Sequence, residues 1–148
     1  MTLLDSYAVL ALLKGEPAAD QVQQLLAEDS AACLTVLGVA EVLDHLVRLV
    51  GVDEEEAVLD LAQLGLAAPP ALTAEVALQA GLLRAGHYHR RDRAISLADC
   101  VLAASARASG SSVATADPHV LDTCRSEGIT VVPLPDARGG IWSSDLDS

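Results

Sequence analysis

The chain has 148 residues, a length that fits one domain, and its 51% content of hydrophobic residues excludes intrinsic disorder. Only 2% of the residues are aromatic, so modules that stack bases on aromatic platforms are poor candidates. A formal net charge of −12 argues against binding of nucleic acid through general neutralisation of phosphates, and a polyanionic substrate would need a local basic patch or bound cations.

The first residues and the cysteines indicate the compartment. Residues 1–14 lack the basic start of a signal peptide and carry Asp5 within their apolar run, and no run of 18 apolar residues occurs. Cys33, Cys100 and Cys124 are odd in number and widely spaced, which favours buried free thiols over disulfides or a zinc site. We therefore expect a soluble, cytoplasmic protein that does not bind membranes.

Short strand-like runs alternate with longer helical stretches along the chain. The strand-like runs lie at residues 2–4, 32–35, 112–115 and 129–132. Apolar periodicity, capping residues and glycine stops predict helices over residues 6–13, 17–28, 36–50, 53–64, 73–85, 97–109 and 118–127. This alternation is typical of βαβ units, so we predict an α/β domain with a small parallel sheet.

The domain is predicted to end before the last stretch of the chain. Residues 136–148 are acidic and mostly polar, so we expect a loosely held tail after a domain of residues 1–135. Within that domain, Asp53 and Glu56 have the spacing of a capping box at the start of the helix predicted from residue 53.

Two acids directly follow predicted strands. Asp5 comes after the strand at 2–4 and Asp117 after the strand at 112–115, and a helix follows each of them. In an open parallel sheet this position is the carboxyl edge, where ligands collect. An aspartate that only caps a helix would stand at the same place, and Asp117 with Pro118 is a good capping pair. Taken singly, each acid is open to both interpretations.

Two further acids lie within predicted helices. The helix predicted around Asp99 carries small or apolar residues on nearly every side, so we expect it to be buried. An ionised carboxylate there is costly unless it is paired or bound to a metal, although the helix dipole helps it in the first turn. Glu41 lies opposite the apolar stripe of its helix, which suits either a water-open site or a solvated glutamate.

Four segments that contain these acids resemble, in order, the four motifs of the PIN domain. They are Leu3-Leu4-Asp5-Ser6 with Ala8, Ala40-Glu41-Val42-Leu43, residues 97–106, and Val113-Ala114-Thr115-Ala116-Asp117. The resemblance covers residues 2 to about 133 and extends to the VapC-like toxins of bacterial toxin-antitoxin pairs. One departure is Val120, where these domains often carry a phenylalanine, and we expect it to affect packing more than chemistry.

The resemblance implies a three-layer α/β/α domain whose four acids meet at the carboxyl edge of the sheet, bind Mg²⁺ or Mn²⁺ and carry the catalysis. These acids are Asp5, Glu41, Asp99 and Asp117. An all-oxygen ligand set selects hard cations rather than zinc. The implied activity is endonucleolytic cleavage of RNA by a metal-activated water. Ser6 and Thr115 are candidate donors to the carboxylates or to phosphate, or else only turn and cap hydroxyls.

Basic residues concentrate just before the helix at 97–109. Four of the nine basic residues lie within ten positions: Arg84, Arg90, Arg91 and Arg93. They either guide RNA phosphates toward the metal site or form a solvated, cationic end to the helix at 73–85. The resemblance further implies an RNA substrate, a cognate VapB-like antitoxin and a homodimer, whereas no motif specifies which RNA is cleaved.

Other acid-containing folds are excluded by single positions. A receiver domain needs a lysine at a late strand end, and the only lysine is Lys14. A haloacid-dehalogenase-type phosphatase needs Asp-x-Asp after its first strand, where this chain has Asp5-Ser6-Tyr7. Two alternatives within the family stay open: a housekeeping RNA-processing nuclease without an antitoxin, and a non-catalytic module that acts only through protein partners.

Overall fold

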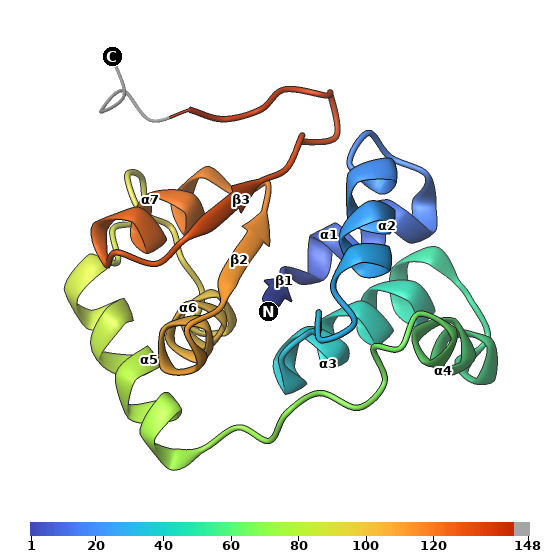
Figure 1. Cartoon of the computed structure of the whole chain (residues 1–148), viewed down its shortest axis with the longest axis horizontal. Helices are drawn as coiled ribbons and strands as arrows, with labels where there is room; N and C mark the ends of the chain where they lie inside the picture. Colours follow the sequence, from blue (N-terminus) through green and yellow to red (C-terminus); the bar gives the residue numbers. More distant parts are fainter. Residues whose placement is uncertain (144–148) are drawn as a thin grey trace.

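A computed structural model of the chain describes residues 1–143, in which three short strands form one parallel sheet (Figure 1). The strands are β1 (Thr2–Leu4), β2 (Ser112–Thr115) and β3 (Val131–Pro133), in the order β1-β2-β3. Leu3 pairs with Val113, and Val113 pairs with Val131. The carboxyl ends of β1 and β2 therefore lie next to each other, which places whatever follows them at one edge of the sheet.

Helices cover both faces of this sheet. They are α1 (Ser6–Lys14), α2 (Ala19–Glu28), α3 (Val36–Asp44), the π-helix η1 (His45–Val50), α4 (Glu54–Gln63), α5 (Ala74–His87), α6 (Leu97–Ser109) and α7 (Pro118–Ser126). Figure 1 shows α1 to α4 on one side of the sheet and α5 to α7 on the other. The predicted three-layer α/β/α arrangement with a small parallel sheet is confirmed.

Two aliphatic cores follow from the alternation of side chains along the strands. Leu4 and Ala114 pack into the core formed with α1 to α4, whereas Leu3 and Val113 pack into the core formed with α5 to α7. Both strands are buried on both faces, which explains why they read as continuous apolar runs. The site that follows them is thus held by two packed layers.

The cysteines and the hydropathy of the helices can be compared with the sequence predictions over the described residues 1–143. Within them Cys33, Cys100 and Cys124 form no disulfide, and burial raises the pKa of the Cys100 thiol to about 11 and that of Cys124 to about 12. No helix in this part of the chain is long and apolar enough to cross a bilayer. Cys100 and Cys124 are buried free thiols as predicted, whereas the free thiol of Cys33 is only partly buried.

Two strand predictions are corrected by the structure. Residues 32–35 make only a single bridge, between Cys33 and Leu3, because the Thr35 carbonyl already accepts the Val39 N–H at 3.0 Å at the start of α3. The last strand begins at Val131 rather than at residue 129, since the Ile129 N–H is used at 2.8 Å by the Cys124 carbonyl at the end of α7. In both places a helix end takes the backbone groups that a strand would need.

Two helix predictions also differ in detail. The helix predicted over 36–50 is divided, because the chain continues from His45 as the π-helix η1, although it stops at Gly51 as expected. The second helix begins at Ala19 rather than at residue 17, after a turn closed by the Ala19 N–H to the Glu16 carbonyl at 2.9 Å.

The start of α4 also departs from the predicted capping box. Asp53 caps α4 by accepting the Glu55 N–H at 3.2 Å, and the described contacts include no reciprocal bond from the Glu56 side chain. A complete capping box occurs instead at α6, where the Ser96 side chain accepts the Asp99 N–H and the Asp99 side chain accepts the Ser96 N–H. Serine at the cap, rather than aspartate, is what that motif normally requires.

Candidate active site

Asp5 lies directly after β1 and caps α1 from a buried position, with 7% of the residue exposed. Its Oδ1 accepts the Ser6 hydroxyl at 3.2 Å and the Tyr7 N–H at 3.3 Å, and its Oδ2 accepts the Thr115 hydroxyl at 2.7 Å. Burial raises the pKa of this carboxyl, the nearby Asp117 charge raises it further, and the Thr115 and Tyr7 hydrogen bonds oppose the rise. The buried charge is thus compensated by three donors.

Asp117 repeats this arrangement at the end of β2. Its Oδ1 accepts the His119 N–H at 2.8 Å as the cap of α7, and its own N–H donates to the Thr115 hydroxyl oxygen at 3.1 Å. The Thr115 hydroxyl consequently bridges the residue after β1 and the residue after β2. The capping interpretation and the carboxyl-edge interpretation of Asp5 and Asp117 are therefore compatible, because each side chain caps its helix while lying at the shared edge of the sheet.

Asp99 belongs to the first turn of α6. Its Oδ2 accepts the Ser96 N–H at 2.8 Å, and its N–H donates to the Ser96 hydroxyl at 3.0 Å. Burial raises the pKa of the Asp99 carboxyl, and the charges of Asp5 and Asp117 raise it further, while the Ser96 hydrogen bonds oppose this. Asp99 is thus both a cap and a member of a group of mutually repelling acids.

Glu41 comes from α3 and is exposed as a residue. Burial of its carboxyl group is nevertheless the largest cause of its raised pKa, followed by the charges of Asp5 and Asp99, whereas the Ser6 hydroxyl lowers it. The charges of Asp5 and Asp99 thus act on the Glu41 carboxyl, although the residue as a whole is exposed. Like charges therefore link Glu41 to Asp5 and Asp99, and link Asp117 to Asp5 and Asp99, although the four acids come from four separate parts of the chain.

The acids differ in how far they suit a metal ion. No group of three or more His, Cys, Asp or Glu side chains within residues 1–143 is spaced to hold a metal ion as the side chains stand. One oxygen each of Asp99 and Asp117 is used in capping, and neither second oxygen accepts a hydrogen bond within the same part of the chain. These oxygens and the all-carboxylate composition suit a hard divalent cation, which would also relieve the repulsion between the acids.

Two small cavities flank the acids. One of about 260 Å³ is lined by Asp5, Asp117 and Tyr7, and another of about 150 Å³ is lined by Glu41, His45 and Tyr7. Another cavity, of about 420 Å³, is mostly apolar and is lined by Met1 and Leu3 of the first strand region, and none of the four candidate acids lines it.

Tyr7 is a residue of the site to which sequence reasoning assigned no role. It lines both cavities next to the acids, and 65% of the residue is exposed. The available signal was its position two residues after Asp5, in a chain with three aromatic residues. Its exposure could not be predicted, because an aromatic residue in the first turn of a helix is as often part of the core.

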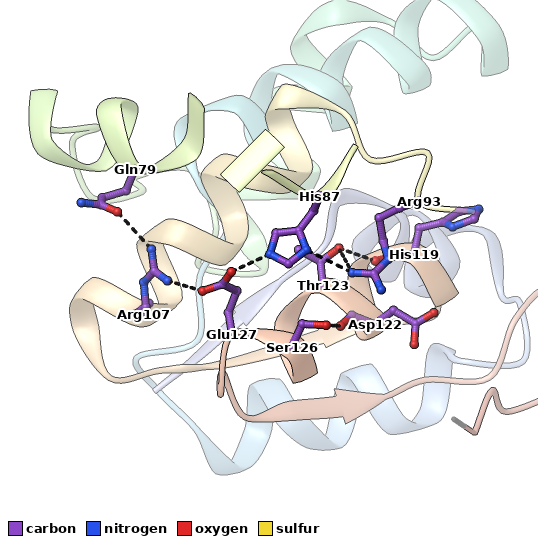
Figure 2. Close-up of polar contacts among 9 residues, drawn as sticks. All are labelled: Gln79, His87, Arg93, Arg107, His119, Asp122, Thr123, Ser126 and Glu127. Atoms are coloured by element: carbon purple, nitrogen blue, oxygen red, sulfur yellow. Dashed lines mark hydrogen bonds and ion pairs between the residues drawn. The ribbon is translucent and has the colours of Figure 1, made fainter. Parts of the chain in front are cut away.

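The basic residues before α6 divide into two groups. The Arg84 Nε donates to the Ile95 carbonyl at 3.1 Å, and its guanidinium lies 4.3 Å from the centre of the Tyr88 ring. Figure 2 shows Arg93 directed toward His87 and Thr123, with its Nη1 3.3 Å from the Thr123 hydroxyl. These two arginines hold the 88–95 loop against the helices.

Arg90 and Arg91 make the second group. Both are exposed in the turn closed by His89 and Arg93, and neither side chain has a partner within residues 1–143. Their guanidinium groups are consequently the ones of the four that can contact a ligand without breaking an internal bond.

Comparisons with known proteins agree with this geometry. A family model described as the PIN domain matches residues 2–132. The structure of VapBC2 from Rickettsia felis bound to a DNA fragment from their promoter is similar with a TM-score of 0.65 and 16% identity, over 88% of this chain and 96% of that chain. FitAcB from Neisseria gonorrhoeae gives a TM-score of 0.60 and 21% identity, over 88% of this chain and 96% of that chain.

A third solved structure, FitAB bound to an IR36 DNA fragment, gives a TM-score of 0.66 and 22% identity, over 89% of this chain and 94% of that chain. At such identities these likenesses show the fold alone. No curated protein sequence matches this chain. The span matched by the family model contains all four acid-bearing segments.

Proposed function

The chain belongs to the PIN domain family, and from this we propose that it is a metal-dependent endoribonuclease, the toxin of a VapBC-type toxin-antitoxin pair. The observation that carries the proposal is the Thr115 hydroxyl, which donates to the Asp5 carboxylate at 2.7 Å and accepts the Asp117 N–H at 3.1 Å, so that these acids meet at one edge of the sheet. Burial and the charges of other acids raise the pKa values of Asp5, Glu41 and Asp99. Carboxyls perturbed in this way cluster at functional sites.

The cation expected at this site is Mg²⁺ or Mn²⁺. Asp5, Asp99 and Asp117 would hold it, with Glu41 bound directly or through a water. When bound, the cation supplies an activated water and neutralises charge on the scissile phosphate. Thr115 orients the Asp5 carboxylate and favours its ionised form by donating to it at 2.7 Å, and the Ser96 N–H fixes one oxygen of Asp99 at 2.8 Å. Such hydrogen bonds orient a metal-binding carboxylate, and the Asp99 Oδ1 accepts no hydrogen bond within residues 1–143.

The test is cleavage of single-stranded RNA by the purified chain. We expect cleavage with Mg²⁺ or Mn²⁺, none in excess EDTA, and a loss of at least about 100-fold in Asp99→Asn, because removal of one charged ligand weakens both metal binding and catalysis. Undiminished cleavage in EDTA would contradict the proposal. Absence of both manganese binding and Asp99-dependent cleavage would favour the non-catalytic interaction module.

A cognate antitoxin and a second copy of the chain complete the proposal. The similar solved structures are complexes named VapBC2, FitAcB and FitAB, and this supports a partner protein encoded next to this chain. We expect growth arrest when the chain is expressed alone in the cytoplasm, rescue by an adjacent small DNA-binding gene product, and a homodimer by light scattering. Equal growth of wild-type and Asp5→Ala cells at matched expression would favour the housekeeping nuclease instead.

Arg90 and Arg91 are proposed to guide RNA phosphates toward the acids. Of the four arginines, Arg84 and Arg93 are engaged in holding the loop, so the role falls on the other two. For Arg90→Ala/Arg91→Ala we expect the slope of log affinity against log salt to fall by about 1.4, because each contact to a single strand contributes about 0.7. Arg138→Ala, an exposed arginine near the chain end, is the control, and an unchanged slope in the double variant would refute the role.

A further inference from the structure

The three aromatic rings of the chain differ in what covers them. The Tyr88 ring lies under the Arg84 guanidinium at 4.3 Å, and the Trp142 ring lies under that of Arg125 at 5.1 Å. Tyr7 is 65% exposed, and no guanidinium covers it within residues 1–143. It is thus the ring whose apolar surface remains open to a ligand.

The position of Tyr7 ties this open ring to the acids. Its backbone N–H donates to the Asp5 Oδ1 at 3.3 Å, so the Tyr7 backbone is in direct contact with the buried carboxylate of the site. Tyr7 lines the cavity that contains Asp5 and Asp117 and also the cavity that contains Glu41. A ligand that occupies either cavity therefore contacts Tyr7.

His45 restricts the orientation of the ring. The two ring centres are 6.5 Å apart and the ring planes meet at 79°, a favourable edge-type arrangement of aromatic rings. The His45 Nε2 is in turn 3.4 Å from the Lys14 Nζ, which ties the imidazole to the end of α1. An exposed ring held by a neighbour loses little freedom when a second ring stacks on it.

We propose that Tyr7 stacks on an unpaired nucleobase next to the scissile phosphate and so sets the register of the RNA on the acids. This inference rests on the proposed ribonuclease function. Stacking accepts any base, because every base has a π-face, but it requires a base outside a duplex. The substrate class is therefore single-stranded or loop RNA, and Tyr7 contributes to binding rather than to the chemical step.

The experiment compares Tyr7→Leu, which keeps apolar bulk, with Tyr7→Phe, which keeps the ring. Steady-state cleavage of a single-stranded oligoribonucleotide is measured with Mg²⁺. We expect Tyr7→Leu to raise KM by about 5- to 100-fold with kcat within about 3-fold, and Tyr7→Phe to stay within about 2-fold of wild type. Leu78→Ala removes a similarly exposed side chain from α5, 70% exposed, and we expect it to leave KM unchanged.

A second measurement locates the stacked base. Oligonucleotides with one abasic nucleotide at successive positions around the cleaved bond are compared on wild type and Tyr7→Leu. At one position the abasic substrate should raise the wild-type KM to that of the variant, and the variant should lose nothing more, which is the signature of one shared interaction. Additive losses at every position would overturn the inference.

The remaining outcomes separate this inference from the function on which it rests. If wild type neither cleaves nor binds RNA, the ribonuclease proposal fails and this one with it. If wild type cleaves and Tyr7→Leu has the wild-type KM, only the role of Tyr7 fails. A fall in kcat alone, an equal defect in Tyr7→Phe, or an unchanged KM with weaker antitoxin binding would each assign Tyr7 another role and overturn the stacking proposal.

Discussion

Thr115 connects the two strand-end acids through a single hydroxyl. The residue is completely buried, donates to the Asp5 Oδ2 at 2.7 Å and accepts the Asp117 N–H at 3.1 Å. A hydrogen bond to the charged form favours ionisation, so Thr115 lowers the pKa of a carboxyl that burial raises. A buried carboxylate at this edge therefore remains available to a cation because of its neighbour in β2.

We predict that Thr115→Val destabilises the fold by about 1 to 3 kcal/mol, since valine has the same shape but leaves a buried acceptor without its donor. RNA cleavage should fall by about 10- to 100-fold because the Asp5 carboxylate loses its orientation. Thr115→Ser should retain most of both. Urea unfolding and initial cleavage rates measure the two effects.

The matched control for this prediction is Thr123→Val. Thr123 is also buried; its hydroxyl donates to the His119 carbonyl at 2.8 Å and accepts from the Arg93 Nη1 at 3.3 Å, and it makes no hydrogen bond to the four acids within residues 1–143. A loss of about 1 to 3 kcal/mol is expected, with a smaller fall in cleavage than in Thr115→Val. If Thr115→Val and Thr123→Val affected cleavage equally, the contact between Thr115 and Asp5 would have no special part in the site.

Asp99 gives the second prediction at the scale of the residue. Because burial and like charges raise its folded-state pKa, the native chain binds more protons at this position than the unfolded chain. Its contribution to stability is fully present below the unfolded pKa and is lost as pH rises through the raised value. Without metal, Asp99→Asn should therefore equal or exceed wild type at neutral pH, by about 0 to 2 kcal/mol after allowance for solvent screening.

Urea unfolding in EDTA across pH measures this difference. The side-chain amide that Asp99→Asn introduces can still accept the Ser96 N–H, so the cap is kept while the charge is removed. The difference between the variant and wild type should grow from about pH 4 upward. A wild type that gains stability over the variant as pH rises would show that Asp99 acts as an isolated cap.

Each end of α6 is fixed by a residue directly beside the helix in the sequence. Gly110 ends the helix in the left-handed conformation, with φ of +66°, and directs the chain into β2. Gly110→Ala should cost about 1 kcal/mol, because a Cβ is disfavoured at positive φ although nothing else obstructs it. Gly81→Ala, in the interior of α5 and equally unobstructed, should instead stabilise by about 0.5 to 1 kcal/mol. Thermal melts decide the sign of each, and a gain in Gly110→Ala would contradict the argument.

Elements with local signals could be predicted from the sequence. The helix at 97–109 is bounded correctly because Ser96 caps it and Gly110 stops it. The run at 32–35 has the composition of a strand, but Thr35 caps α3 and only Cys33 pairs with β1. That pairing depends on residues distant in the sequence, so the composition of the run could not predict it. The change to a π-helix at His45 likewise has no local signal, since it changes a hydrogen-bond register rather than an apolar pattern.

The site shows the same division. The proximity of Asp5 and Asp117 follows from parallel strands, whose carboxyl ends meet at one edge. The commitment of Arg84 to the Ile95 carbonyl and of Arg93 to Thr123 depends on how a loop packs, so the basic stretch could be recognised but not divided. The exposure of the Tyr7 ring depends on packing in the same way.

At the scale of the molecule, the acids of the site are part of a chain with a net charge of −12. Such a charge attracts divalent cations to the whole surface, and this attraction is screened by salt. A response to Mg²⁺ is therefore evidence for a site only when it exceeds the response to equal ionic strength and depends on a named ligand. The dependence of the Mg²⁺ response on pH is a third criterion for a site, since a carboxyl group must lose its proton before it binds a metal.

We predict that about 10 mM Mg²⁺ raises the melting temperature of wild type more at pH 8 than at pH 5, because carboxyls with raised pKa values bind protons more readily, and protons compete with the cation more strongly as the pH falls. A ligand present at about 1,000 times its Kd contributes about 4 kcal/mol, which sets the upper limit of the effect. Choline chloride at equal ionic strength should reproduce only the surface contribution. Asp99→Asn should lose most of the increase, because it removes one negative ligand while keeping the cap. A melting temperature that responds equally to Mg²⁺ and choline, or equally in wild type and Asp99→Asn, would mean that the four acids repel one another without sharing a cation.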